Sequence, residues 1–294
     1  MQNRFAPAPS PYLVPFTSHF RIAAAPTTPP RGSGGKEHNE LALAQSIAAM
    51  RKLQSRLLAG NRRALLVVFQ ALDAAGKDGT IKAVMSGINP AGCDVHAFKR
   101  PSDDELDHDF MWRIYQRAPA RGRIGIFNRS HYEEVLVVKV HPEILESQRL
   151  PESRSMKALW NERYESIRDF EKHLARNGTT IVKFFLHVSK DEQKKRLLER
   201  ISDPEANWKF EAADVNERKN FSRYQSAFQE ALNETSRPWA PWYAVPADDK
   251  HFMRRTVAEI LVDTMKGLDL HYPVASPAEL RAMAAARRTL LSER

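Results

Sequence analysis

A buried strand followed by a loop of small residues, residues 64–80, constrains this chain more than any other segment. The run "ALLVVFQ" is short, continuous and apolar, which is typical of a strand covered on both faces. The next residues, "ALDAAGKDGT", nearly match the phosphate-binding pattern G-x-x-x-x-G-K-[ST]. Gly76 and Lys77 are in place, whereas Ala71 replaces the first glycine and Asp78 replaces the hydroxyl residue. A strand, a loop and a helix in this order predict an anion-binding turn at the positive end of the helix, although a tight connection with no ligand has the same outline.

Strand and helix patterns alternate along the rest of the chain. Further strands are predicted for "CDVHAF", "GRIGIF", "TTIVKFFLHV" and "WYAVPA". Helices are predicted from Asn39 to Gly60, over residues 78–88 and 103–118, and around 153–176, 190–201, 214–232 and 251–268. Such alternation indicates a parallel sheet with helices on both faces. Residues 1–36 carry seven prolines and cannot form a long helix, yet "YLVPFTSHFRI" is apolar enough to pack, so we expect an extended arm lying on the domain.

Composition and motifs narrow the classes of function. Lys and Arg total 45 against 36 Asp and Glu, a net charge of +9 that favours a polyanionic partner or, alternatively, only a solvated basic surface. A single cysteine, Cys93, excludes an intramolecular disulfide and fits a reducing compartment. No apolar run approaches the roughly 18 residues of a membrane span, and the N-terminus lacks the apolar stretch of a secretory signal. Motifs for zinc, a serine nucleophile, a dinucleotide or nucleic acid are also missing from the sequence. We therefore expect a cytoplasmic protein with no membrane or nucleic-acid partner.

Asp73 places a carboxylate inside the predicted anion-binding loop. Mg²⁺ favours one or two carboxylates together with phosphate oxygens and water, so Asp73 is a candidate magnesium ligand, with Mn²⁺ as the alternative ion. The competing interpretation is an aspartate that only stabilises its own turn. The third strand ends in "IFNRSHYEEV", at a position where P-loop proteins often hold the metal with an aspartate. Asn128 takes that position here and is the second candidate ligand.

Basic residues after the third and fourth strands are candidates for charge stabilisation. Arg129 is placed to neutralise a transferring phosphoryl group, and Glu133 opens the next helix, where an acid also complements the helix dipole. Arg196 and Arg200 form an i, i+4 pair that suits a lid over phosphates, although basic helices are often only solvated. The candidates for phosphate or nucleotide contacts are Ala74, Ala75, Gly76, Asp78, Gly79, Asn128, Glu133 and Lys209, and those for a long polyanion are Lys82, Lys99, Arg100, Arg113 and Arg117.

In combination these segments resemble the second family of polyphosphate kinases. The likeness runs from "PYLVPF" through "ALLVVFQALDAAGKDGT", "FKRPS", "ELDHDFMWR" and "GIFNRSHYEEVLVVKVHP" to "FFLHVSKDEQKKRLLER", "NWKF" and "APWYAVPADDK". The form "NRSHYEEVLV" is similar to the class III branch, which is associated with both AMP and ADP. The family's loop is G-x-D-x-x-G-K, so the resemblance implies that the loop aspartate lies on the magnesium side. It also implies that Lys77 and Arg129 are catalytic, with Arg196 as the lid arginine and Arg200 in support. Ala71 and Asn128 depart from the family's first glycine and from its Walker B aspartate.

The resemblance also implies a fold and an activity. The fold is a three-layer α/β/α P-loop kinase related to thymidylate kinases, with a central parallel sheet and a helical lid. We expect an arm over residues 1–36, a kinase domain over 37–270 with the lid at about 190–220, and a helical extension over 271–294. The implied activity is magnesium-dependent, in-line transfer of a terminal phosphoryl group from inorganic polyphosphate to AMP or ADP, with no covalent enzyme intermediate.

Other partners and activities complete the set of expectations. ATP and guanine nucleotides are further candidate ligands, and a homo-oligomer, either a dimer or a tetramer, is expected. Two alternatives to the polyphosphate-dependent activity stay open at this point. One is an ATP-dependent nucleotide kinase of the same fold, and the other is a polyanion-binding protein with no catalytic activity.

Overall fold

The computed structural model describes residues 5–151, 155–205, 207–210 and 212–293. Its centre is a single sheet of five strands, namely β1 (Ala64–Gln70), β2 (Cys93–Ala97), β3 (Ile124–Asn128), β4 (Thr179–His187) and β5 (Trp242–Pro246). The strand order is β2-β3-β1-β4-β5, and every pairing in it is parallel. The register places Val67 of β1 beside Ile126 of β3 and Val182 of β4. The predicted α/β fold with a central parallel sheet is therefore confirmed.

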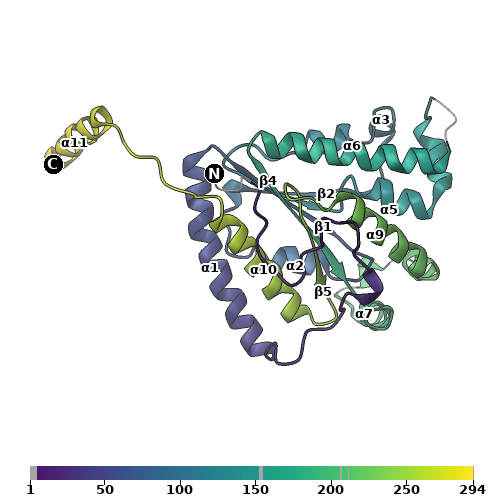
Figure 1. Ribbon diagram of the computed structural model, residues 1–294. Helices are drawn as coiled ribbons and strands as arrows, with labels where there is room; N and C mark the ends of the chain where they lie inside the picture. Colours follow the sequence, from purple (N-terminus) through teal and green to yellow (C-terminus); the bar gives the residue numbers. More distant parts are fainter. Residues whose placement is uncertain (1–4, 152–154, 206, 211, 294) are drawn as a thin grey trace.

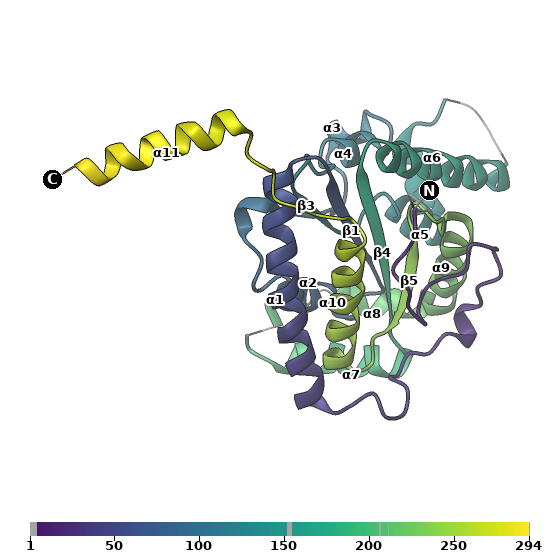
Figure 2. The ribbon, with the colours of Figure 1, turned by 60° about the vertical axis from the view of Figure 1, so that its left-hand side comes forward.

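Helices form a layer on each face of the sheet (Figures 1 and 2). One layer contains α1 (Lys36–Gly60), α2 (Lys77–Val84) and α10 (Lys250–Lys266), and the other contains α5 (Glu133–Val140), α6 (Met156–Arg176) and α9 (Phe221–Thr235). The other elements are α3 (Asp103–Leu106), α4 (Trp112–Tyr115), α7 (Lys190–Ser202), α8 (Ala212–Glu217), α11 (Pro277–Ser292) and the 3-10 turns η1 (Ile22–Ala24), η2 (Pro90–Gly92), η3 (Pro142–Gln148), η4 (Asn207–Lys209) and η5 (Arg218–Asn220).

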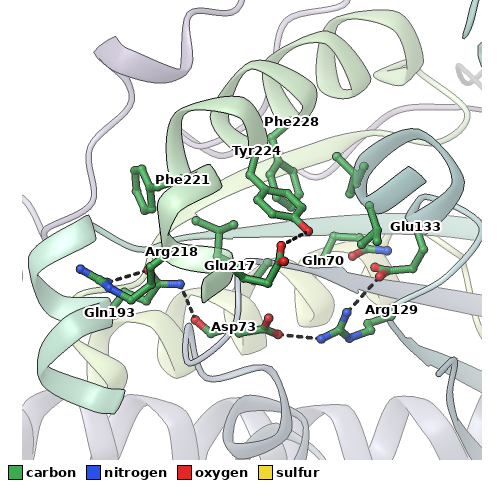
Figure 3. Close-up of a pocket in the computed structure, with 14 residues that line it drawn as sticks. Gln70, Asp73, Arg129, Glu133, Gln193, Glu217, Arg218, Phe221, Tyr224 and Phe228 are labelled. Carbon is green, nitrogen blue, oxygen red and sulfur yellow. Dashed lines mark hydrogen bonds and ion pairs between the residues drawn. The ribbon is translucent and has the colours of Figure 1, made fainter. Parts of the chain in front are cut away.

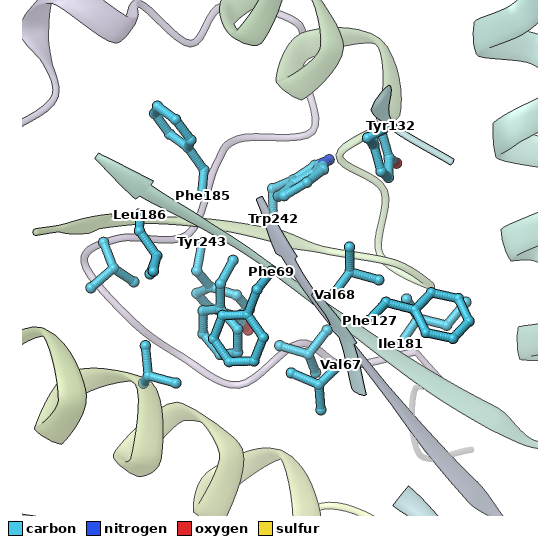
Figure 4. Close-up of a cluster of buried hydrophobic side chains, with 14 of the residues drawn as sticks. Val67, Val68, Phe69, Phe127, Tyr132, Ile181, Phe185, Leu186, Trp242 and Tyr243 are labelled. Carbon is cyan, nitrogen blue, oxygen red and sulfur yellow. The ribbon is translucent and has the colours of Figure 1, made fainter. Parts of the chain in front are cut away.

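The central strand is buried along its whole length. All seven residues of β1 are buried, which is the environment that its continuous apolar sequence predicts. Figure 4 shows Val67, Val68 and Phe69 among large side chains from the neighbouring strands. The rings of Phe69 and Phe184 stack with their centroids 5.2 Å apart. This packing gives the loop that follows β1 a rigid base.

The N-terminal arm covers the outer edge of β5. Leu13 forms an antiparallel bridge with Tyr243. The Val14 N–H donates to the carbonyl of Trp242 at 2.9 Å, and the Ala244 N–H donates to the carbonyl of Tyr12 at 2.8 Å. An uncovered strand edge is a template for unwanted pairing, so the arm protects the sheet on this side.

Two predicted helices are broken, and local hydrogen bonds explain the first break. The prediction of a single helix over residues 103–118 is wrong, because the chain forms the two short helices α3 and α4 there. Ser102 and Glu105 form a capping box that starts α3. Asp109 then accepts a hydrogen bond from the Met111 N–H at 2.8 Å just before α4 begins. Such side-chain bonds compete with a continuous helix. The helix predicted over 214–232 is likewise divided into α8, η5 and α9.

The C-terminal helix α11 projects away from the rest of the molecule (Figures 1 and 2). Ser276 and Glu279 form a capping box at its start, with Pro277 as the first helical residue. None of its described residues is buried. Across the described part of the chain, no helix has the length and apolar character needed to cross a bilayer.

A buried ionic cluster ties β4 to the helices of the second layer. The Lys183 ammonium donates to Glu171 Oε2 at 2.6 Å, to the Tyr132 hydroxyl at 2.7 Å and to the Thr235 carbonyl at 2.9 Å. The Tyr132 hydroxyl in turn donates to Glu171 Oε1 at 2.8 Å. Burial lowers the pKa of Lys183 to about 8, against the opposing effect of Glu171. Because Tyr132 immediately precedes Glu133, this cluster fixes the point where α5 begins.

We expect Glu171→Leu to lower the free energy of unfolding by about 3–5 kcal/mol, because it leaves the Lys183 ammonium buried and uncompensated. The double variant Glu171→Leu, Lys183→Met should recover most of that loss, since it removes both charges. Denaturant unfolding at pH 7 measures both effects. A double variant no more stable than the single variant would show that the pair itself stabilises the fold.

Candidate active site

The site lies where the carboxyl ends of the central strands meet. The loops after β1 and β3 and the start of α7 all reach this edge of the sheet, as expected for ligand binding in an open parallel sheet. Figure 3 shows the side chains that converge there from these loops and from α5 and α9.

The backbone of the phosphate loop explains why an alanine is tolerated at its first position. Ala71 lies outside the left-handed region, so a Cβ there meets no conformational penalty. The left-handed conformations occur instead at Ala74, with a φ of 61°, and at Gly76, with a φ of 102°. A Cβ on Gly76 would also lie 3.3 Å from the Met253 side chain. The loop therefore requires glycine where α2 begins and not where β1 ends.

Lys77 is buried at the first position of α2. Its ammonium donates to the Ala71 carbonyl at 2.8 Å and to the Leu72 carbonyl at 3.4 Å. Burial and, after it, the charge of Arg129 lower the pKa of Lys77 to about 8, and the nearby acids oppose them only in part. The lysine thus binds the carbonyl oxygens of its own loop, and phosphate oxygens carrying negative charge are stronger acceptors for it.

Arg129 joins the loop after β3 to the loop after β1. Its Nη2 donates to Asp73 Oδ1 at 2.6 Å, and its Nη1 donates to Glu133 Oε2 at 3.0 Å. Glu133 is the main cause of a raised pKa for Arg129, with burial opposing and Asp73 adding to the rise. The φ of Arg129 is 62°, an uncommon conformation for a residue with a side chain, and such conformations concentrate at functional sites. Three of the predicted site residues are thus in direct contact, although Asp73 and Arg129 are far apart in the sequence.

The two predicted metal ligands come from different segments, Asp73 from the phosphate loop and Asn128 from the end of β3. Asn128 Nδ2 donates to Asp78 Oδ1 at 2.6 Å, while Asp73 binds Arg129. Among the described residues, no group of three or more His, Cys, Asp or Glu side chains is arranged to hold a metal ion. The oxygen atoms present nevertheless fit Mg²⁺, because this ion takes one or two carboxylates and completes its shell with substrate phosphates and water.

Arg196 of α7 reaches the back of the phosphate loop. Its Nη1 donates to the Ala75 carbonyl at 2.8 Å and its Nη2 to the Ala247 carbonyl at 2.6 Å, so it links this loop to the one after β5. Its Nε donates to Glu192 at 2.9 Å. Arg200, by contrast, pairs with Asp214 at 3.1 Å within the segment 190–220. The backbone of Lys209 lies in η4, and its side chain lies outside the part of the chain that the structure describes.

The candidates for polyanion binding occupy different environments. Lys82, Lys99, Arg100 and Arg117 are exposed. Arg113 is buried, donates to the Lys99 carbonyl at 2.8 Å and lies over the Phe98 ring, an arrangement that supports the loop after β2. This loop lies beside the site, since the Phe98 N–H donates to the Asn128 carbonyl at 3.0 Å. The structure therefore does not bring the Arg113 side chain to the phosphate loop.

A pocket beside Arg129 contains residues that the sequence interpretation missed. Phe221, Tyr224 and Phe228 line it from α9, and Glu217 and Arg218 line it from the segment just before α9 (Figure 3). The Tyr224 hydroxyl donates to Glu217 at 2.8 Å. The available signal was the i, i+3, i+7 spacing of the three aromatic residues, which places them on one face of the helix. The pocket combines an aromatic wall with two arginines and with the carboxylates of Asp73, Glu133 and Glu217.

The lowered pKa of Lys77 makes a prediction about stability. The Lys77 ammonium keeps its proton up to about pH 10.5 in the unfolded chain and only up to about pH 8 in the folded chain. Below pH 8 the buried charge therefore lowers the stability of the fold, and this loss disappears as the pH rises from 8 to 10.5. Lys77→Met removes the effect. The stability of the variant relative to the wild type, measured as the difference in free energy of unfolding, should therefore be about 3 kcal/mol greater at pH 7 than near pH 10.5. Urea unfolding at the two pH values measures this, and a difference that does not change with pH would contradict it.

Comparisons with known proteins identify the family of this chain. The family model described as polyphosphate kinase 2 (PPK2) matches residues 34–272. An "ADP-polyphosphate phosphotransferase" of Rhodopseudomonas palustris is 52% identical over 257 residues, which cover 87% of this chain and 89% of the relative. An "AMP/ADP-polyphosphate phosphotransferase" of Meiothermus ruber is 46% identical over 240 residues, which cover 82% of this chain and 86% of the relative.

A solved structure gives the same result for the fold. The crystal structure of polyphosphate kinase 2 from Arthrobacter aurescens TC1 superposes with a TM-score of 0.85 at 38% identity and covers 96% of this chain and 99% of that one. The family model, the relatives and the shared P-loop kinase fold support one conclusion. This chain belongs to the polyphosphate kinase 2 family.

Proposed function

We propose that this protein transfers the terminal phosphoryl group of inorganic polyphosphate to AMP or ADP. The observation that carries the proposal is the contact between Arg129 and Asp73 beside Lys77, which gathers the charged residues of two loops around a phosphate-binding turn. Relatives that the chain matches over most of their length are named for ADP and for both AMP and ADP, and these names support the choice of acceptor.

The chemistry requires position and positive charge from the protein. In phosphoryl transfer the attacking and leaving oxygens lie in line, and charge spreads over the oxygens of the group in flight. Lys77 and Arg129 are placed to bind that group, and Arg196 holds the loop that surrounds it. Asp73, with Asn128, would hold Mg²⁺, which neutralises phosphate charge when it is bound. Transfer in a single step needs no side chain to form a covalent bond with the phosphoryl group.

We assign the acceptor nucleotide to the side of the site between α5 and α9, where the pocket beside Arg129 lies. The aromatic residues Phe221 and Tyr224 offer a stacking surface for the base, and Arg129 lies at the end where the acceptor phosphate must approach. Glu133 lies between these two regions and is already bonded to Arg129. A second carboxylate there would repel phosphate, so its proposed role is to orient a ribose hydroxyl or a base amine.

Incubation of the protein with AMP or ADP, Mg²⁺ and polyphosphate, followed by separation of the nucleotides, tests the proposal. ADP and ATP should accumulate, and the reaction should stop when Mg²⁺ is chelated. Asp73→Asn should need more Mg²⁺ for half of its maximal rate. Transfer from ATP with none from polyphosphate would assign the site to an ATP-dependent nucleotide kinase. Polyphosphate binding without turnover would assign it to a polyanion-binding protein.

Glu133→Gln should change the ratio of AMP to ADP turnover by roughly tenfold, which corresponds to about 1.4 kcal/mol of differential transition-state binding. Loss of the Glu133 contact also loosens Arg129, but that effect acts on both acceptors and cancels in the ratio. The control is Glu37→Gln, which removes an exposed acid from the first turn of α1 and tests only the helix dipole, worth about 0.3–1 kcal/mol. An AMP to ADP ratio equal to that of the control would contradict a role in acceptor choice and would leave Glu133 with its contact to Arg129 and its effect on the helix dipole.

Guanine nucleotides as further substrates, Mn²⁺ as a replacement ion and assembly into a dimer or tetramer stay predictions from the sequence. Turnover with GDP, activity in Mn²⁺ and light scattering of the purified protein test them one by one.

A further inference from the structure

The helix α10 carries an arginine to the side of the phosphate loop that faces away from the pocket. Arg254 lies in the second turn of α10, and α10 packs beside α2 (Figures 1 and 2). A Cβ built on Gly79 would lie 3.1 Å from Arg254 Nη2. Because Gly79 is the third residue of α2, the Arg254 guanidinium lies against the first turn of the helix that follows the phosphate loop.

Arg254 has no anionic partner within the described residues. Its Nε is buried and finds no hydrogen-bond acceptor there. The carboxylate that acts on it is Glu40, and Glu40 is itself 3.2 Å from His251. The adjacent Arg255 is different, since it donates to Glu259 at 2.9 Å, to the Ser33 carbonyl at 2.9 Å and to Asn39 at 3.0 Å. Of these two arginines, Arg255 has a structural role and Arg254 does not.

The surroundings of Arg254 contain both cations and acids, and the acid in the first turn of α2, Asp78, is bonded to Asn128. Burial lowers the pKa of Arg254 and the charge of Arg196 lowers it further, with Glu40 opposing. Lys77 and the positive end of the α2 dipole lie at the same turn. A desolvated, unpaired guanidinium among like charges opposes folding, and a bound anion reverses that effect. The planar fork of an arginine matches two oxygens of a phosphate group.

The position of Arg254 indicates which of the two substrates, the nucleotide or polyphosphate, lies beside it. The residues that line the acceptor pocket come from the ends of β1 and β3, from α5, α7 and α9, and from the segment just before α9. None of the described lining residues comes from α2 or α10. In-line transfer requires donor and acceptor to approach the moving phosphoryl group from opposite sides. An acceptor in the pocket therefore places the donor chain on the side of α10.

We propose that Arg254 binds the polyphosphate donor, at a phosphate next to the one held by Lys77. The proposal rests on the proposed function, because it assumes that the pocket holds the nucleotide. Lys82, three residues after Gly79 on α2 and exposed, continues the same positive face away from the loop. The donor chain thus approaches Lys77 past Arg254, at the first turn of α2.

The variants Arg254→Gln and Arg254→Lys test this assignment, with Lys266→Gln as the matched control. Lys266 lies at the other end of α10, is exposed and pairs with Asp263, so its loss removes one positive charge from the same helix without touching the loop. Arg254→Gln should raise KM for polyphosphate about tenfold relative to the control and leave KM for the nucleotide unchanged. Arg254→Lys should have a KM for polyphosphate between those of the control and Arg254→Gln, because lysine keeps the positive charge and loses the planar, two-pronged guanidinium.

Thermal unfolding separates this role from a structural one. Because Arg254 is unpaired and partly desolvated, Arg254→Gln should keep or raise the melting temperature of the free protein. The stabilisation that polyphosphate gives the wild type in the absence of nucleotide should shrink in the variant. A fall in melting temperature with unchanged KM for polyphosphate, or a rise in KM for the nucleotide alone, would overturn the assignment.

Two measurements together distinguish failure of this inference from failure of the proposed function: turnover by the wild type, and polyphosphate binding by Arg254→Gln in the absence of nucleotide. If the wild type transfers no phosphoryl group, the proposed function fails. If the wild type turns over normally and Arg254→Gln binds polyphosphate as the control does, only the role of Arg254 fails.

Discussion

Positive charge gathered around one small loop is the constraint on which this structure depends. Lys77, Arg129, Arg196 and Arg254 approach the loop from different elements, and each needs oxygen atoms to bind. Lys77 and Arg196 use backbone carbonyls, and Arg129 uses the carboxylates of Asp73 and Glu133. Under the proposed function, phosphate oxygens are further acceptors for Lys77 and Arg129. Such preorganised charge is what phosphoryl transfer requires of a protein, because it adds little cost of rearrangement as the transition state forms.

The rest of the fold holds these cations in place. The fully buried β1 supports the phosphate loop from behind, and the Lys183, Glu171 and Tyr132 cluster anchors the turn that carries Arg129. Gln193 of α7 donates to the Asp73 carbonyl at 3.0 Å, so α7 also holds the backbone of the loop. The strained conformations of Ala74 and Arg129 persist because packing and hydrogen bonds on all sides determine them.

Features encoded in a few consecutive residues were predictable from the sequence. The apolar run of β1 and the residues Gly76 and Lys77 identify a strand, a loop and a helix, and the structure has all three. The position of the helix breaks near Asp109 and at η5 was not predicted, since side-chain hydrogen bonds, and not periodicity, set the first of them. The departure at Ala71 has a simple explanation only once the φ angles are known, because sequence alone does not say which loop position is left-handed.

Features that depend on contacts between distant segments were not predictable. Nothing in the sequence around Arg254 distinguishes it from Arg255, and only the packing of α10 on α2 shows that one is paired and the other is not. The spacing of the aromatic residues of α9 is equally typical of a helix that packs in the core. Their place in the pocket follows from the position of α9 beside α5. Arg113 is the converse case, a basic residue that folding buries beneath a loop.

The rate of phosphoryl transfer from polyphosphate to AMP or ADP by Lys77→Met tests the central claim most directly. The account predicts a fall of about 100-fold or more, since the variant removes the cation at the first turn of α2 while the pocket and the fold are kept. Circular dichroism and the melting temperature should show that the variant is folded. A folded Lys77→Met protein that transfers phosphate at a rate near that of the wild type would contradict the assignment of this loop as the site of the reaction.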